Sequence, residues 1–136
     1  MRSLPKNWRE IAERVNAEVN ALPQIPEQQG RDEWKRAGPK GGDCEDLCLL
    51  KLNKLLEAGF PIERLRLATC TVGRTGASTS GSGHAVLVVE DRHEQWILDN
   101  LVPNIYPSNM LFVAGAIRES IQEIGGSQKW IKWEAA

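Results

Sequence analysis

The stretch GGDCEDLCLLKLNKLLEAGF, residues 41–60, decides the fold because it is typical of one buried helix. Asp43 is a good N-cap residue, Asp46 is a weaker acidic partner for a capping box, and Gly59 is a natural C-terminal cap. Between these ends, apolar residues fall on most faces of the helix: Leu47, Cys48, Leu49, Leu50, Leu52, Leu55 and Leu56. A helix this apolar is expected to be central and largely buried.

A second helix precedes this one, and strands follow it. Apolar residues at helical spacing predict an amphipathic helix over residues 8–22, which Pro23 ends. After the central helix, the pattern changes to the alternation of a strand over residues 64–72. The other expected elements are loops over 28–42 and 73–83, a β-hairpin from HAVLVVED (84–91) and QWILDN (95–100), helical parts within 107–124, and an edge strand over 129–134. This order predicts a single α+β domain over residues 1–136 with an antiparallel sheet.

Composition excludes several classes of protein. The chain has 136 residues, of which 41% are hydrophobic, so it can bury one proper core. The net charge of −1 creates no overall field that would favour nucleic acid or an anionic membrane. No apolar run is long enough to span a bilayer, and the N-terminal stretch lacks the apolar core of a signal peptide. We therefore expect a chain that begins near Met1 and is cytoplasmic by default.

Cys44 is the candidate nucleophile among the three cysteines. Three is too few for a disulfide framework, and suits a reducing compartment or a functional thiol. Cys44 stands at the predicted first position of the buried helix, where free backbone N–H groups and the helix dipole favour a thiolate. The same N–H groups can stabilise a tetrahedral oxyanion. Cys48 and Cys70 are expected to be small core residues.

A cysteine nucleophile needs a base and a group that orients the base, and the register of the hairpin supplies both. The chain has two histidines; His93 is expected to be exposed in the hairpin turn, whereas His84 begins the first hairpin strand. A two-residue turn at residues 91–92 places His84 directly opposite Asp99, within reach of a carboxylate. A register shifted by two residues keeps the pair diagonal on one face, and a shift of one residue substitutes Asn100.

Two other interpretations of these residues remain open. A cross-strand His–Asp pair also occurs as a purely structural contact. Cys44, Cys48, Cys70 and His84 could instead form a zinc site, although Cys-x₃-Cys on one helix is not the usual spacing of zinc ligands.

The ordered motifs GGDCED (41–46), GHAVLVV (83–89) and WILDN (96–100) resemble those of the bacterial transglutaminase-like cysteine proteinases. The resemblance extends to VNAEVN (15–20), Trp34, LRLATC (65–70) and DNLVPNI (99–105). It implies a papain-like or transglutaminase-like core in which the nucleophile helix packs on an antiparallel sheet. It also implies that Cys44, His84 and Asp99 form a catalytic triad, which is the set that the hairpin register suggests independently.

The same resemblance implies bound Ca²⁺ at Asp43, Glu45 and Asp46. Three carboxylates beside Cys44 oppose thiolate formation, and a bound cation would cancel much of that repulsion. The alternative is that they serve only as a cap and as partners of the helix dipole. The best understood members of the family are periplasmic proteases that clip large surface adhesins. For a copy this short, a further hypothesis is a bacteriophage or prophage origin, with a virion-associated enzyme or one delivered to the periplasm by other means.

These observations predict a cysteine peptidase that acts on a protein or peptide through a thioester. Trp34 and Asn100 are expected to line its substrate site, and neither nucleic acid nor a membrane span is expected among its partners. One alternative is a transglutaminase or amide acyltransferase with the same triad. Another is a non-catalytic binding module of the same fold.

Overall fold

A computed structural model describes residues 2–23, 44–72, 82–92, 94–110, 117–123 and 129–134 of the chain. Within these residues, six strands form one antiparallel sheet in the order β4-β3-β2-β1-β5-β6. The elements in chain order are α1 (Trp8–Asn20), α2 (Cys44–Glu57), η1 (Ile62–Arg64), β1 (Leu65–Val72), β2 (Ser82–Asp91), β3 (Glu94–Leu98), β4 (Tyr106–Pro107), η2 (Ser108–Met110), β5 (Ile117–Gln122) and β6 (Trp130–Lys132). The predicted α+β class with an antiparallel sheet is confirmed.

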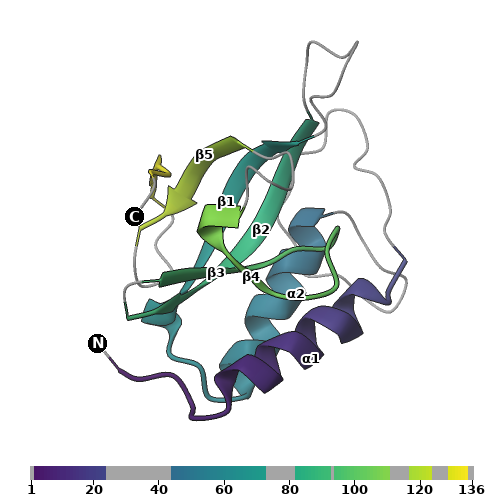
Figure 1. Cartoon of the computed structure of the whole chain (residues 1–136), viewed down its shortest axis with the longest axis vertical. Coiled ribbons are helices and arrows are strands. Elements are labelled where there is room, and N and C mark those ends of the chain that lie inside the picture. The colour runs from purple at the N-terminus through teal and green to yellow at the C-terminus, as the bar shows by residue number, and fades with distance from the viewer. Residues whose placement is uncertain are drawn as a thin grey trace.

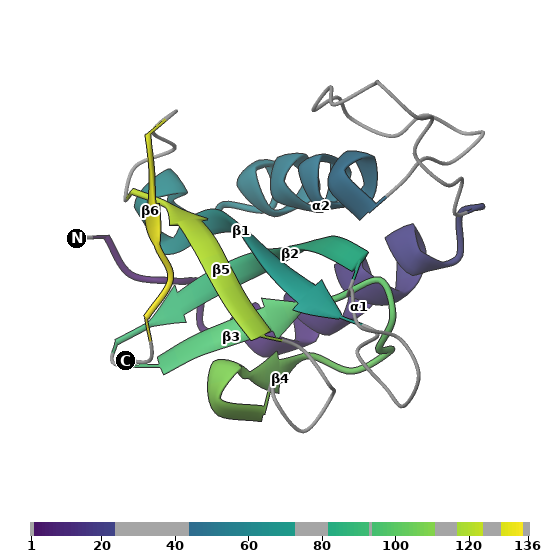
Figure 2. The ribbon, with the colours of Figure 1, turned by 90° about the horizontal axis from the view of Figure 1, so that it is seen from above.

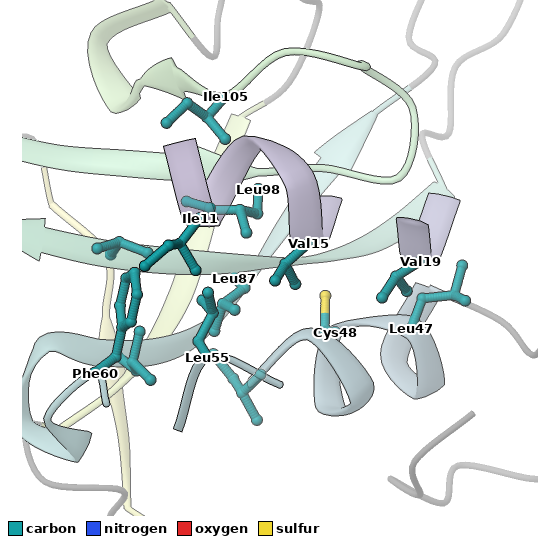
Figure 3. Close-up of a cluster of buried hydrophobic side chains, with 14 of the residues drawn as sticks. Ile11, Val15, Val19, Leu47, Cys48, Leu55, Phe60, Leu87, Leu98 and Ile105 are labelled. Carbon is teal, nitrogen blue, oxygen red and sulfur yellow. The ribbon is translucent and has the colours of Figure 1, made fainter. Parts of the chain in front are cut away.

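The two helices pack side by side on one face of the sheet (Figures 1 and 2). Between them and the sheet lies the larger core, much of which Figure 3 draws. The sheet contributes alternate residues to it, because successive side chains of a strand point to opposite faces. The buried members of this core are Trp8, Ile11, Ala12, Val15, Val19, Leu47, Cys48, Leu55, Phe60, Leu65, Leu67, Ala85, Leu87, Val89, Leu98 and Ile105.

The opposite face of the sheet carries a smaller core. Its buried members are Ala68, Cys70, Val86, Val88, Ile97, Ile121 and Trp133, with Tyr106 packed beside them. The central strands are therefore buried on both faces, which explains why HAVLVV reads as a continuous apolar run. No helix among the described residues is long and apolar enough to cross a bilayer.

The bounds of the predicted helices agree closely with the structure, but α2 is less buried than expected, because Leu49, Leu50 and Leu52 are only half-buried and Leu56 is exposed. α1 ends two residues before the predicted limit, and α2 lies within the predicted stretch 41–60. Gly59 has a φ of +98°, the left-handed conformation that a C-terminal cap needs, and the next N–H, from Phe60, bonds back to the carbonyl of Leu55 at 3.0 Å. Cys48 and Cys70 are buried core residues, as expected. Asp43 and the predicted loop over 28–42 lie outside the described residues.

Two strand predictions need correction. The segment 107–124, expected to be helical in parts, contains the short helix η2, but it also contains β5, which pairs with β1 inside the sheet. The predicted hairpin register is also wrong, because Asp91 pairs with Glu94 and the ladder continues to Leu87 opposite Leu98. This is the register shifted by two residues. β6 confirms the predicted edge strand.

Candidate active site

His84 and Asp99 form a buried pair at one end of the sheet. Nε2 of His84 lies 2.6 Å from Oδ1 of Asp99, and each side chain is 5% exposed. His84 belongs to β2, whereas Asp99 follows the last residue of β3. Continued past Leu98, the observed register would place Asp99 opposite Val86, two residues from His84 on the same face. The two side chains therefore meet diagonally.

The carboxylate of Asp99 accepts two further hydrogen bonds. The N–H of Leu101 donates to Oδ1 at 2.9 Å, and the hydroxyl of Tyr106 donates to Oδ2 at 2.9 Å. Burial alone would raise the pKa of Asp99, but the hydrogen bond from His84 and these two donors outweigh it and hold the pKa below its ordinary value. Burial, together with the neighbouring carboxylate, raises the pKa of Tyr106, so its hydroxyl remains a donor.

Cys44 is the first residue of α2 and approaches His84 from the helix side of the sheet. Its Sγ accepts a hydrogen bond of 3.4 Å from the N–H of Ala85, the residue after His84. Because Nε2 of His84 faces Asp99, Nδ1 is the ring nitrogen left for the sulfur. Burial lowers the pKa of His84, but hydrogen bonds to Asp99 and Cys44 more than compensate and raise it to about 9. The raised pKa favours the imidazolium form of the ring beside the carboxylate of Asp99.

The other two cysteines, Cys48 and Cys70, are unreactive thiols in the core. Burial is the main cause that raises the pKa of Cys48 well above its ordinary value, and it raises the pKa of Cys70 to about 12. Both remain thiols, while Cys44 alone of the three is not fully buried. The alternative of a zinc site is not supported, because within the described part of the chain no three His, Cys, Asp or Glu residues are arranged to hold a metal.

A model of the bacterial transglutaminase-like cysteine proteinases matches residues 1–130. The chain belongs to this family. A search of curated proteins finds no match.

Three structures of LapG from Legionella pneumophila have the same fold as this chain. The calcium-bound structure has a TM-score of 0.73 at 20% identity, over 98% of this chain and 75% of LapG. A second structure of LapG has a TM-score of 0.69 at 23% identity, over 90% and 69% of the two chains. The EGTA-treated structure has a TM-score of 0.66 at 20% identity, over 93% and 72%.

Two of the three acidic residues beside Cys44, namely Glu45 and Asp46, lie within the described residues. Glu45 is half-buried and Asp46 is buried, both in the first turn of α2. Their carboxylates are hard oxygen donors of the kind that Ca²⁺ takes, but the described residues bring no third such group to them. Asp43, the third predicted ligand, lies outside the described residues.

Of the two predicted substrate-site residues, Asn100 lies within the described residues and Trp34 does not. Asn100 directly follows Asp99 and is half-buried, so it lies beside the candidate triad. Trp34 and His93 lie outside the described residues. Sequence reasoning missed Tyr106, whose only signal was its place soon after the DNLVPNI motif, and it gave no role to Asn20 in the VNAEVN motif. The side-chain N–H₂ of Asn20 donates to the backbone carbonyl of Asp99 at 3.0 Å.

Proposed function

We propose that the chain is a cysteine peptidase that hydrolyses a peptide bond of a protein substrate through Cys44, His84 and Asp99. The observation that carries this proposal is the arrangement around His84, whose Nε2 lies 2.6 Å from Oδ1 of Asp99, while the N–H of the next residue, Ala85, donates to Sγ of Cys44 at 3.4 Å. The proposed nucleophile, base and orienting group thus lie close together, and this supports nucleophilic catalysis. Membership of a cysteine proteinase family supports the same reaction class.

The proposed chemistry runs in two steps. The sulfur of Cys44 attacks the carbonyl carbon of the substrate, and the imidazolium of His84 gives its proton to the leaving amine, which leaves a thioester. His84, now neutral, takes a proton from water, and the resulting attack releases the acid and restores the thiolate. Asp99 holds the ring throughout and stabilises its charged form. The backbone N–H of Cys44 is the proposed oxyanion donor, and Asn100 and Trp34 are proposed to line the substrate site.

Alkylation by iodoacetamide tests this proposal without a substrate. Cys44 is half-buried, whereas Cys48 and Cys70 are buried. His84→Ala is expected to lower the rate at which Cys44 is labelled near neutral pH by about tenfold or more, since the thiolate loses its imidazolium partner. His93→Ala, at the only other histidine of the sequence, is the matched control and should label like the wild type. Equal labelling of the wild type and His84→Ala would refute the triad and favour a binding module with an ordinary thiol.

Hydrolysis and acyl transfer differ in what reaches the thioester. Incubation of a model protein substrate such as casein with a primary amine, followed by mass spectrometry, separates the two. New chain termini indicate peptide hydrolysis. Amine joined to glutamine side chains would instead indicate a transglutaminase and would overturn the peptidase assignment.

We also propose that Asp43, Glu45 and Asp46 bind Ca²⁺. The relative LapG has a calcium-bound structure, and the donor chemistry of Glu45 and Asp46 fits the ion. When bound, Ca²⁺ would supply positive charge that offsets the carboxylates around Cys44. Calorimetry with CaCl₂ should show binding, and EGTA should lower the melting temperature. Asp46→Asn should abolish both effects, whereas Asp91→Asn, far along the chain in β2, should preserve them; if the wild type shows neither effect, the assignment is wrong.

A further inference from the structure

The two asparagines of α1 lie one helical turn apart and both donate hydrogen bonds to the segment that follows β3. The side-chain N–H₂ of Asn16 donates to the carbonyls of Val102 and Pro103, each at 3.0 Å. That of Asn20 donates to the carbonyl of Asp99 at 3.0 Å and more weakly to that of Val102 at 3.5 Å. Residues i and i+4 share one face of a helix, so one face of α1 makes hydrogen bonds along the segment 99–103.

These hydrogen bonds matter because Asp99 lies one residue beyond the end of the β2–β3 ladder. The β2–β3 ladder ends at the pair Leu87 and Leu98, so strand pairing does not hold the backbone of the next residue. Its carbonyl accepts from Asn20 and, at 3.3 Å, from the N–H of Val102, which closes a turn. The position of the Asp99 main chain therefore depends on α1 and on this turn.

Among the described residues, the side-chain amides of Asn16 and Asn20 make hydrogen bonds only to this segment. Asn16 is fully buried. The Oδ1 atoms of both Asn16 and Asn20 are buried and accept no hydrogen bond from any described residue. Only the N–H₂ end of an amide can face a carbonyl oxygen, so the orientation of both side chains is fixed by the carbonyls that they hold.

We propose that Asn20 is a positioning residue of the candidate active site: through the carbonyl of Asp99 it fixes the carboxylate that orients His84. The inference rests on the proposed triad and extends it to α1, which contributes no reacting group. Asn16 has a different part, because it holds only Val102 and Pro103 and stabilises the segment as a whole. The VNAEVN motif thus combines a positioning residue with a structural one.

The pair provides its own control, since the two residues have the same type, helix and target segment. Asn20→Asp is nearly isosteric but replaces the donor with an acceptor that repels the Asp99 carbonyl. We expect it to slow iodoacetamide labelling of Cys44 by about tenfold to a hundredfold, because small displacements of a catalytic group have effects of this size. It should also broaden or remove the downfield proton signal of the His84 ring N–H that faces Asp99.

Asn16→Asp should behave differently. We expect a lower melting temperature than that of Asn20→Asp, because Asn16 is fully buried and loses two bonds of 3.0 Å. Labelling of Cys44 and the proton signal of His84 should remain close to those of the wild type. If either aspartate variant fails to fold, the milder alanine variants of the same positions provide the same comparison.

Two results would overturn the inference. One is wild-type labelling and an unchanged His84 signal in both Asn20→Asp and Asn20→Ala. The other is an equal loss in the Asn16 and Asn20 variants that follows only their melting temperatures, as a structural role predicts. The His84→Ala variant separates this failure from failure of the proposed function: if labelling does not depend on His84, the triad itself is wrong, whereas dependence on His84 without dependence on Asn20 refutes only the positioning role.

Discussion

The ion pair between His84 and Asp99 should give the folding stability a characteristic dependence on pH. The pKa of His84 is raised from 6.5 to about 9, so the folded chain holds this proton more tightly than the unfolded chain does. The resulting stabilisation is fully present below pH 6.5 and is lost as the pH rises through about 9. Since a tenfold change in proton affinity corresponds to about 1.4 kcal/mol, the loss across this window is about 3 kcal/mol.

Asp99→Asn removes the charge and can keep the geometry. The new side-chain oxygen can accept from His84 and from the N–H of Leu101, as Oδ1 of Asp99 does. The new N–H₂ can donate to the hydroxyl of Tyr106, which reverses its role from donor to acceptor. Without the carboxylate, burial lowers the pKa of His84 with much less opposition. The pH-dependent loss of stability should therefore shrink to about 1 kcal/mol or less.

Urea unfolding at a series of pH values from about 5 to about 10 measures this difference, provided that the transition is two-state. The wild type should lose stability steeply between pH 6.5 and 9, and Asp99→Asn should show a nearly flat profile there. Asp91→Asn, which removes a carboxylate at the far end of β2, is the matched control and should follow the wild type. Parallel profiles for the wild type and Asp99→Asn would refute the ion pair as the cause.

Three further substitutions test other features of the fold by urea unfolding. Lys51 is fully buried, its Nζ has no hydrogen-bond partner within the described residues, and burial lowers its pKa. Lys51→Met should therefore stabilise the chain by about 1–3 kcal/mol at neutral pH. The control Lys54→Met should change stability little, and a destabilised Lys51→Met would contradict this account. Gly59→Ala should cost about 1–2 kcal/mol from backbone strain alone, because φ is +98° and no atom lies within 4 Å of the added Cβ; a neutral result would refute it. Tyr106→Phe should cost about 1.5–3 kcal/mol, the usual value of a hydrogen bond to a charged group; no loss would show that water replaces the hydroxyl.

The elements with strong local signals could be predicted from the sequence. α1 and α2 carry apolar residues at helical spacing, and Gly59 marks the end of α2. β5 could not be predicted, because its sequence IRESIQ has few strand-forming residues and no regular alternation. It is a strand because it pairs with β1 and buries Ile121 against the smaller core. Strand propensity reflects such packing more than the intrinsic preference of the segment.

Tyr106 and Asn20, which hold Asp99, could not be predicted from the sequence for a similar reason. Tyr106 reaches Asp99 only because β4 pairs with β3 at the edge of the sheet. Asn20 reaches the same residue because α1 packs along α2 and β3, across 79 positions of sequence. Neither contact has a local pattern, so only the tertiary arrangement reveals them.

The pairing of His84 with Asp99, by contrast, was predicted despite an error in the register. The hairpin was expected to turn at residues 91–92, but Asp91 remains in the ladder opposite Glu94. An error of two residues preserves which side chains share a face, because the side chains of a strand alternate with a period of two. A slip of one residue would have turned Asp99 to the opposite face and put Asn100 in its place. The prediction was therefore robust to any even shift, and the exact meeting of the two side chains depends on Asp99 leaving the strand, where Asn20 and Tyr106 hold it.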